Sequence, residues 1–177
     1  MNGNWLRVTP AELARAKDDL EWAYELAEAA GEAGDDRSSG TGKAWQAFAF
    51  LLERRAFDVP IVEGAEGFVE YPDADPEDEE FQEFLEHLEE SGKDWGYGPP
   101  SYLTPEQVAT AAAELATITP EDLIRGVDPA ELQRADIYPN RWDRPDELVW
   151  VAHFLPDARR FFATAARRGD AVICWIN

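Results

Sequence analysis

The C-terminal stretch Ala171-Val172-Ile173-Cys174-Trp175-Ile176 decides the fold expected of this 177-residue chain. Side chains alternate between the two faces of a strand, and here both alternating sets are apolar. Such a strand belongs inside a sheet that is covered on both faces. Shorter strands are expected at residues 5–8, 59–63 and 68–71. The predicted sheet is therefore small and uses both ends of the chain.

A repeated helix-start signature organises the rest of the sequence. In each copy an N-cap oxygen precedes a proline, and an acidic or amide side chain follows at the third helical position. The copies are Thr9-Pro10-Ala11-Glu12, Asp75-Pro76-Glu77-Asp78, Thr104-Pro105-Glu106-Gln107, Thr119-Pro120-Glu121-Asp122 and Asp128-Pro129-Ala130-Glu131, with a looser version at Asp143-Arg144-Pro145-Asp146. These starts predict helices at 10–30, 43–56, 76–90, 105–117, 120–125, 129–135 and 145–168.

Proline 156 is expected to kink or divide the last of these helices, and residues 31–42 are expected to form a loop because of their composition. With 45% hydrophobic residues the chain can fill a core despite its charge. We therefore expect a single α+β domain over residues 1–177, mostly helical, around a small sheet that includes both termini.

Composition excludes several classes of protein. The single cysteine, Cys174, excludes an intramolecular disulfide and any zinc or iron–sulfur site with several cysteines. The N-terminus has no basic segment followed by an apolar run, so no signal peptide is expected. The longest apolar runs have six residues, against the roughly 20 that a spanning helix needs. We expect a cytoplasmic protein without a membrane segment.

Negative charge is concentrated in one part of the chain. Residues 61–100 hold fourteen acids and one lysine, which accounts for −13 of the total net charge of −21. The segment 70–94 is expected to form an acidic loop followed by an amphipathic helix at 76–90. Its apolar positions have helical spacing, and the acids remain on the outer face: Glu79, Glu80, Glu83, Glu86 and Glu90. Such a field repels nucleic acid and anionic membranes and selects cationic partners.

Two interpretations of this helix stay open. It is either a docking face for a basic partner or a solvated helix that keeps the protein soluble. A calcium loop is excluded, because Asp78 occupies the position of the turn glycine and Phe84 that of the closing glutamate.

Signatures of catalysis are weak. His87 and His153 are the only candidates for a base near neutral pH; the expected roles are a surface ion pair for His87 and a half-buried pair with Asp157 for His153. No serine lies in a nucleophile-elbow pattern, and Cys174 is expected to pack in the core. Residues 38–43 fail the pattern of a phosphate-binding loop. We therefore predict no catalytic residue, no metal and no cofactor.

Aromatic loops form the other candidate site. The stretch 95–103 carries three aromatic rings on a Gly/Pro-rich backbone, and 137–142 places an arginine beside aromatic rings. Aromatic loops with an arginine suit recognition of small ligands or peptides, although they can equally pack against the domain. The candidate cleft comprises Trp45, Tyr97, Tyr102, Tyr138, Arg141 and Trp142.

Several ordered motifs together resemble the YfbM-like family of small bacterial cytosolic proteins of unknown function. The motifs are Leu6-Arg7-Val8-Thr9, Lys43-Ala44-Trp45 with Phe50-Leu51-Leu52, Gly96-Tyr97-Gly98-Pro99 with Tyr102-Leu103-Thr104, Ile137-Tyr138-Pro139 and Arg168-Gly169-Asp170-Ala171. The resemblance spans the chain and implies a single α+β domain but no reaction. Relatives often carry a histidine and then Thr-Gly in the second helix, where this chain has Ala49 and Glu53-Arg54. That departure counts against an enzyme mechanism centred there.

Two functional hypotheses follow. The first is a non-catalytic interaction protein, of antidote or adaptor type, that docks a basic protein partner through helix 76–90. The alternative is a small-molecule-binding domain or enzyme with an aromatic cleft near Tyr97, Tyr102, Tyr138 and Arg141. The sequence leaves the oligomeric state open.

Overall fold

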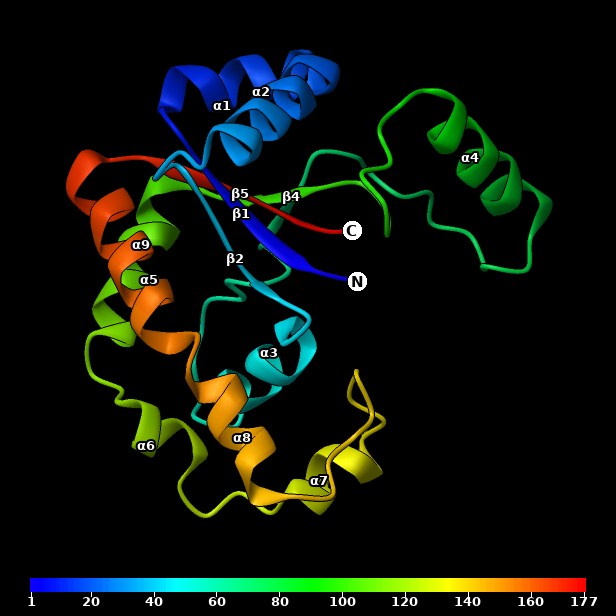
Figure 1. Cartoon of the computed structure of the whole chain (residues 1–177). Coiled ribbons are helices and arrows are strands. Elements are labelled where there is room, and N and C mark those ends of the chain that lie inside the picture. The colour runs from blue at the N-terminus through cyan, green and yellow to red at the C-terminus, as the bar shows by residue number, and fades with distance from the viewer.

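Strand β5 (Ala171–Ile176) lies in the middle of a five-stranded antiparallel sheet, as its two apolar faces predict (Figure 1). The computed structural model describes the backbone of residues 1–177 and every side chain except those of Glu89 and Pro145. The strand order is β2-β1-β5-β4-β3, with β1 at Gly3–Val8, β2 at Ser38–Gly42, β3 at Glu66–Gly67 and β4 at Ser101–Leu103. Both termini belong to this sheet, and Asn2 and Asn177 exchange backbone hydrogen bonds.

Helices cover both faces of the sheet (Figure 1). One layer consists of α1 (Pro10–Asp18) and α2 (Leu20–Ala33), and the other is built around α5 (Pro105–Leu115) and α9 (Leu155–Arg168). The second layer is extended by α3 (Trp45–Glu53), α6 (Pro120–Ile124), α7 (Pro129–Arg134) and α8 (Pro145–Ala152). Helix α4 (Glu79–Glu90) stands apart from both layers. The chain is thus the single, mostly helical α+β domain that the sequence predicts.

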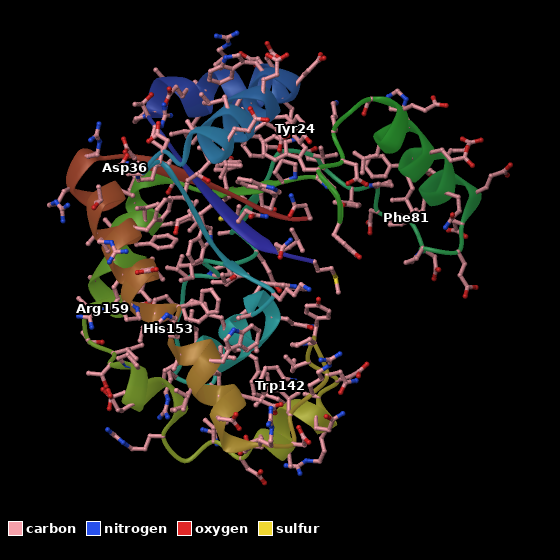
Figure 2. The ribbon with its side chains drawn as sticks, in the orientation of Figure 1. Tyr24, Asp36, Phe81, Trp142, His153 and Arg159 are labelled. Atoms are coloured by element: carbon pink, nitrogen blue, oxygen red, sulfur yellow. The ribbon has the colours of Figure 1, made fainter. Side chains whose placement is uncertain are left out.

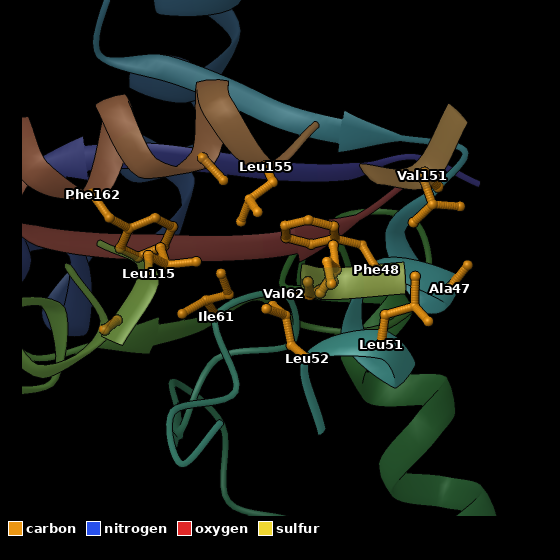
Figure 3. Packing of buried hydrophobic residues seen from close by; sticks show 14 of the residues in the cluster. Ala47, Phe48, Leu51, Leu52, Ile61, Val62, Leu115, Val151, Leu155 and Phe162 are labelled. Carbon is orange, nitrogen blue, oxygen red and sulfur yellow. The ribbon is translucent and has the colours of Figure 1, made fainter. Parts of the chain in front are cut away.

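Side chains on the two faces of β5 belong to two separate cores. Val172 and Cys174 belong to the larger core, which contains residues of α3, α5, α8 and α9 (Figure 3). Ala171 and Ile173 belong to a smaller core with α1 and α2. All four side chains are buried, so the central strand is covered on both faces. Burial of Val172 and Ile173 contributes roughly 1.5–3 kcal/mol each relative to an exposed position.

Local helix signals are confirmed at four of the predicted starts. Capping boxes with reciprocal hydrogen bonds begin α1 at Thr9, α5 at Thr104, α6 at Thr119 and α7 at Asp128. Each cap satisfies backbone N–H groups that lack a partner within the helix, which is worth about 1 kcal/mol.

Two long helices expected from the sequence are each divided. Residues 10–30 do not form one helix, because the chain breaks at Asp19, whose carboxylate accepts from Trp22 N at 3.0 Å and caps α2. Residues 145–168 divide before Pro156 into α8 and α9, as expected. Proline cannot donate the backbone bond that a continuous helix would need there.

The loop expected at residues 31–42 is wrong over its second half, which forms strand β2. This strand has no apolar pattern and pairs with β1 through the backbone. Arg37, just before β2, connects this strand to β1 and α1. Its guanidinium donates twice to Arg7 O, at 3.0 and 3.1 Å, and once to the Glu12 carboxylate at 2.7 Å. Burial alone would raise the pKa of Glu12, but bonds from Thr9 and Arg37 hold that pKa below its usual value.

The strands expected at 59–63 and 68–71 are also wrong. Residues 59–63 turn back on themselves, and Val59, Ile61 and Val62 bury their side chains in the larger core. The carbonyl of Ile61 accepts from the Trp5 indole N–H at 2.6 Å, so it bonds to a side chain and not to a neighbouring strand. The edge strand β3 lies at Glu66–Gly67, before the expected 68–71, and pairs with β4, which the sequence did not reveal.

Substitution at Gly40 tests the close pairing of β2 with β1. A Cβ atom at Gly40 would overlap the carbonyl oxygen of Gly3 and would stand 3.1 Å from Asn4 Cα. We expect Gly40→Ala to lower the free energy of unfolding by about 1–3 kcal/mol, measured by urea denaturation.

The matched control is Gly31→Ala. Gly31 lies within α2, and a Cβ there meets nothing within 4 Å. This variant should gain about 0.5–1 kcal/mol, because alanine is the better helix residue. Equal effects of the two substitutions would contradict the pairing described for β2.

Candidate functional site

The large hydrophobic side chains that remain exposed gather at two places on the surface. Tyr24, Tyr71 and Tyr97 lie within or beside the acidic segment 70–94, while Val149 and Trp150 lie on α8. Exposed aromatic side chains are common at binding sites. The two places coincide with the two regions that the sequence singles out, and we describe each in turn.

Residues 70–94, called here the acidic arm, project from the domain. Figure 1 shows α4 held away from both helical layers by extended connections on either side. Helix α4 begins at Glu79, three residues later than predicted, because Asp75 and Pro76 form a turn instead of a helix start. In that turn Asp78 N donates to Asp75 O at 2.9 Å and Glu77 N donates to the Asp75 carboxylate at 3.0 Å. The helix is followed by Gly92 at φ +67, near the end predicted from Ser91-Gly92.

Aromatic packing inside the arm holds the helix in place (Figure 2). The ring of Tyr71 lies 6.3 Å from that of Phe81 and 5.3 Å from that of Phe84, centroid to centroid. Leu88 is buried at 4% exposure. Burial and the nearby carboxylate of Asp94 raise the pKa of the Tyr71 phenol. The arm therefore has a small apolar cluster of its own, which is built around residues of the arm itself.

Most acids of the arm are exposed, and those whose side chains the structure describes form no ion pair. Side chains of the predicted acidic face are all exposed: Glu79, Glu80, Glu83, Glu86 and Glu90. Each ion pair found among the described side chains uses an acid outside residues 61–100. Most arginines elsewhere in the chain, by contrast, form ion pairs with acids, as Arg54 does with Glu131 at 3.0 Å. The arm thus carries negative charge that the fold does not neutralise.

The six residues of the predicted aromatic cleft do not form one cleft. Tyr102 on β4 is buried in the smaller core, against Phe68 at 4.8 Å and under the Lys17 ammonium at 4.5 Å. Tyr97 is 65% exposed beside the arm, and its backbone N–H donates to Ile176 O. The correction follows from the sheet, because β4 directs Tyr102 toward α1 and α2.

Trp45 takes a third position, at the start of α3. Its ring is partly buried against the larger core, and its indole N–H is buried without an acceptor among the described residues. The Cβ atom of Trp45 approaches Gly3 so closely that a side chain at Gly3 would meet it at 2.6 Å. Trp45 therefore packs between α3 and the start of β1.

The remaining three cleft residues do share a hollow. Tyr138, Arg141 and Trp142 line a pocket of about 420 Å³ together with Lys43, Pro139, Glu147 and Trp150. We call this hollow the α8 pocket. It differs from the predicted cleft because residues of α8, which sequence reasoning did not include, form one of its walls.

The loop that carries these residues is fixed by side chains. Trp142 is 3% exposed, and its indole N–H donates to Ile137 O at 2.7 Å. Tyr138 N donates to the Gln46 side chain of α3 at 2.7 Å. Asn140, at φ +57, has a side chain that donates to the Asp136 carboxylate. Asn and Asp tolerate this left-handed conformation better than other residues with a Cβ atom.

A further pocket was not predicted. It measures about 460 Å³ and lies between α3 and the turn at 57–63, where Phe50 and Phe57 provide apolar wall and Glu53, Asp58 and Glu63 provide carboxylates. The apolar run at 59–63 is the sequence signal for this pocket, but the run predicts a strand and not a pocket wall.

The histidines and the cysteine considered for catalysis lie at separate places in the fold. His153 is exposed, and the expected pair with Asp157 is wrong, because that carboxylate bonds to Arg160 at 2.6 Å. His87 is exposed on α4. Cys174 is buried, and burial raises the pKa of its thiol far above the usual value. Within the described part of the chain, no group of three or more His, Cys, Asp or Glu residues could hold a metal ion.

Among the described residues, no helix has the length and apolar character needed to cross a membrane.

Comparisons with known proteins identify relatives of the chain but no activity. The sequence model of a family described as a domain of unknown function, DUF1877, matches residues 1–175. Among solved structures, the chain is similar to YfbM from Escherichia coli, a protein of unknown function. The two share a TM-score of 0.59 and 12% sequence identity over 98% of each chain, which shows a common fold. No curated protein matches the sequence.

Salt dependence of thermal stability tests whether the arm's charges repel one another. Raising the ionic strength from about 0.01 M to about 0.15 M shortens the screening length from about 30 Å to about 8 Å. We expect the melting temperature to rise over this range, because screening relieves the repulsion between the acids. Substitution of Glu79, Glu80, Glu83, Glu86 and Glu90 by glutamine, the arm variant, should reduce the salt-dependent rise.

A control variant removes the same charge elsewhere. It replaces Glu25, Glu28, Glu32, Glu106 and Glu121 by glutamine; these residues are exposed and form no recorded ion pair. Both variants shift the net charge of −21 by five units. An equal loss of salt dependence in the two variants would assign the effect to overall charge and not to the arm.

Proposed function

This chain belongs to the DUF1877 family, and on that premise we propose that it is a binding module whose acidic arm docks a cationic segment of a partner protein. The observation that carries the proposal is the uncompensated charge on a projecting helix. Twelve acids and one lysine lie within residues 70–94, and none of the recorded ion pairs involves them. Blocks of like charge often serve as interaction segments.

Charge on the arm favours a partner of the opposite sign. Like charges on one helix repel, and Glu90 also lies at the helix end where the dipole disfavours an acid. A segment rich in Lys and Arg would relieve both effects on binding. The same field would raise the association rate at low ionic strength.

Exposed tyrosines give this surface contacts beyond charge. Tyr71 is 51% exposed within the arm, and Tyr24 lines a hollow together with Glu90 and Asp94. Tyr97 follows the arm directly. Tyrosine is enriched among the residues that dominate binding energy at protein interfaces. We therefore propose a partner segment in which apolar side chains accompany the basic ones.

The proposal favours a non-catalytic role. Nucleic acid is disfavoured as a partner, because phosphates would meet a field of the same sign. The arm offers carboxylates and tyrosines, and its one histidine, His87, is exposed on α4. A basic protein segment is the partner whose chemistry matches these groups.

Binding of a defined cationic peptide tests the proposal. The probe is a peptide with six arginines and two leucines, titrated by calorimetry into the protein and into the two glutamine variants described above. We expect the arm variant to bind at least about tenfold more weakly than the unmodified protein, since each lost contact between charges near a protein surface contributes up to about 1 kcal/mol. The control variant should change affinity by less than about twofold.

Two results would contradict the proposal. The first is an equal loss of affinity in the arm and control variants, which would indicate non-specific attraction to net charge. The second is affinity that does not fall between about 0.05 M and about 0.3 M salt, since exposed charges are screened over that range. A pull-down from lysate at low and high salt then identifies the natural partner, which must be basic and must elute with salt.

A further inference from the structure

We propose that the α8 pocket binds a small planar aromatic carboxylate. The pocket, of about 420 Å³, falls within the range typical of small-ligand sites. Its position differs from that of the acidic arm, and its chemistry has the opposite sign. The inference does not depend on the proposed function.

Two cations without partners face this pocket. Lys43 and Arg141 both line it, and neither forms a hydrogen bond or ion pair with any side chain or backbone group that the structure describes. Most arginines here bind acids or helix-end carbonyls, as Arg55 does with the carbonyl of Arg125 and Arg159 with that of Ile118. Two unpartnered cations in one hollow provide a site for an anion.

The acid in the pocket wall is already engaged. The Glu147 carboxylate accepts from Asp143 N at 2.9 Å and from Arg144 N at 3.1 Å. The Arg144 guanidinium also lies 3.9 Å from it. The Glu147 carboxylate is thus bonded to the start of α8, and Lys43 and Arg141 remain available to a ligand.

Aromatic side chains supply flat walls for a ring. Trp150 is 39% exposed on α8, and Phe154 supports it edge-on at a centroid distance of 6.0 Å. The backbone N–H of Tyr138 donates to the Gln46 side chain, and the Trp142 indole N–H donates to Ile137 O. Because these bonds fix the loop before binding, less conformational entropy is lost when a ligand enters. Ring-on-ring contacts and the two cations together select an aromatic anion.

The net negative charge of the chain favours a monoanion over a dianion at long range. The whole chain carries −21, so a dianion entering the pocket meets about twice the long-range repulsion that a monoanion does. The guanidinium of Arg141 can bind both oxygens of a carboxylate at once. A single negative charge on a ring of one or two cycles therefore fits best.

Calorimetric titration with indole-3-acetate tests this inference. Tryptamine and indole-3-ethanol carry the same ring with a positive and with no charge, and adenosine monophosphate is an aromatic dianion. We expect saturable binding of indole-3-acetate at millimolar or lower concentration, and binding at least about tenfold weaker for each of the other three compounds.

Substitutions locate the binding to the pocket. Arg141→Gln and Lys43→Gln should each weaken indole-3-acetate binding by about tenfold, whereas Arg134→Gln, which removes an exposed cation of α7 outside the pocket, should leave it unchanged. Trp150→Leu should weaken binding, and Tyr97→Leu should not. Circular dichroism and melting temperature confirm that each variant is folded.

Three results would overturn the inference. They are the absence of saturable indole-3-acetate binding, equal or tighter binding of tryptamine, indole-3-ethanol or adenosine monophosphate, and an Arg134→Gln variant that loses as much affinity as Arg141→Gln. A failure of the cationic-peptide experiment would leave this inference untouched, because none of the five glutamates in the arm variant lines the pocket.

Discussion

Burial of β5 on both of its faces is the constraint on which the fold depends. A strand that is apolar on both sides must have a strand on each edge and a layer on each face. Strand β1 and strand β4 supply the edges, and the two cores supply the faces. Because β1 and β5 come from opposite ends of the sequence, the chain must close on itself before either core is complete. Contacts between residues so distant in sequence form late and cooperatively.

Burial of β5 on both faces does not constrain the acidic arm. The arm leaves the domain after β3, returns before β4, and packs the partly buried Phe81 and Phe84 against its own Tyr71. Eleven net negative charges lie within residues 70–94, none of which belongs to either core. A segment with few contacts to the core unfolds locally at a low free-energy cost and adapts readily to a partner. The α8 pocket, in contrast, includes the ring of Trp142, which is buried and bonded to Ile137 O.

Sequence reasoning succeeded where the cause is local. A capping box at Thr104 or Asp128 operates within four residues, and the alternation along β5 identifies a central strand by itself. It failed where the cause is tertiary. Strand β2 pairs through the backbone of serine and glycine, so its side chains carry no signal. The predicted cleft combined Tyr102 with Arg141 by residue type, but β4 turns Tyr102 into the smaller core, and the pocket that Arg141 lines instead includes Lys43, which is distant in sequence.

Native-state hydrogen exchange tests the central claim that β5 supports two cores while the arm lies outside both. Amides of β5 and of its neighbour β1 should exchange only through global unfolding, with the free energy measured by denaturant. Amides of α4 should exchange through local opening at a clearly lower free energy, with little dependence on denaturant. Equal protection of α4 and β5 would contradict the account, as would exchange in β5 at a free energy below that of α2 or α5.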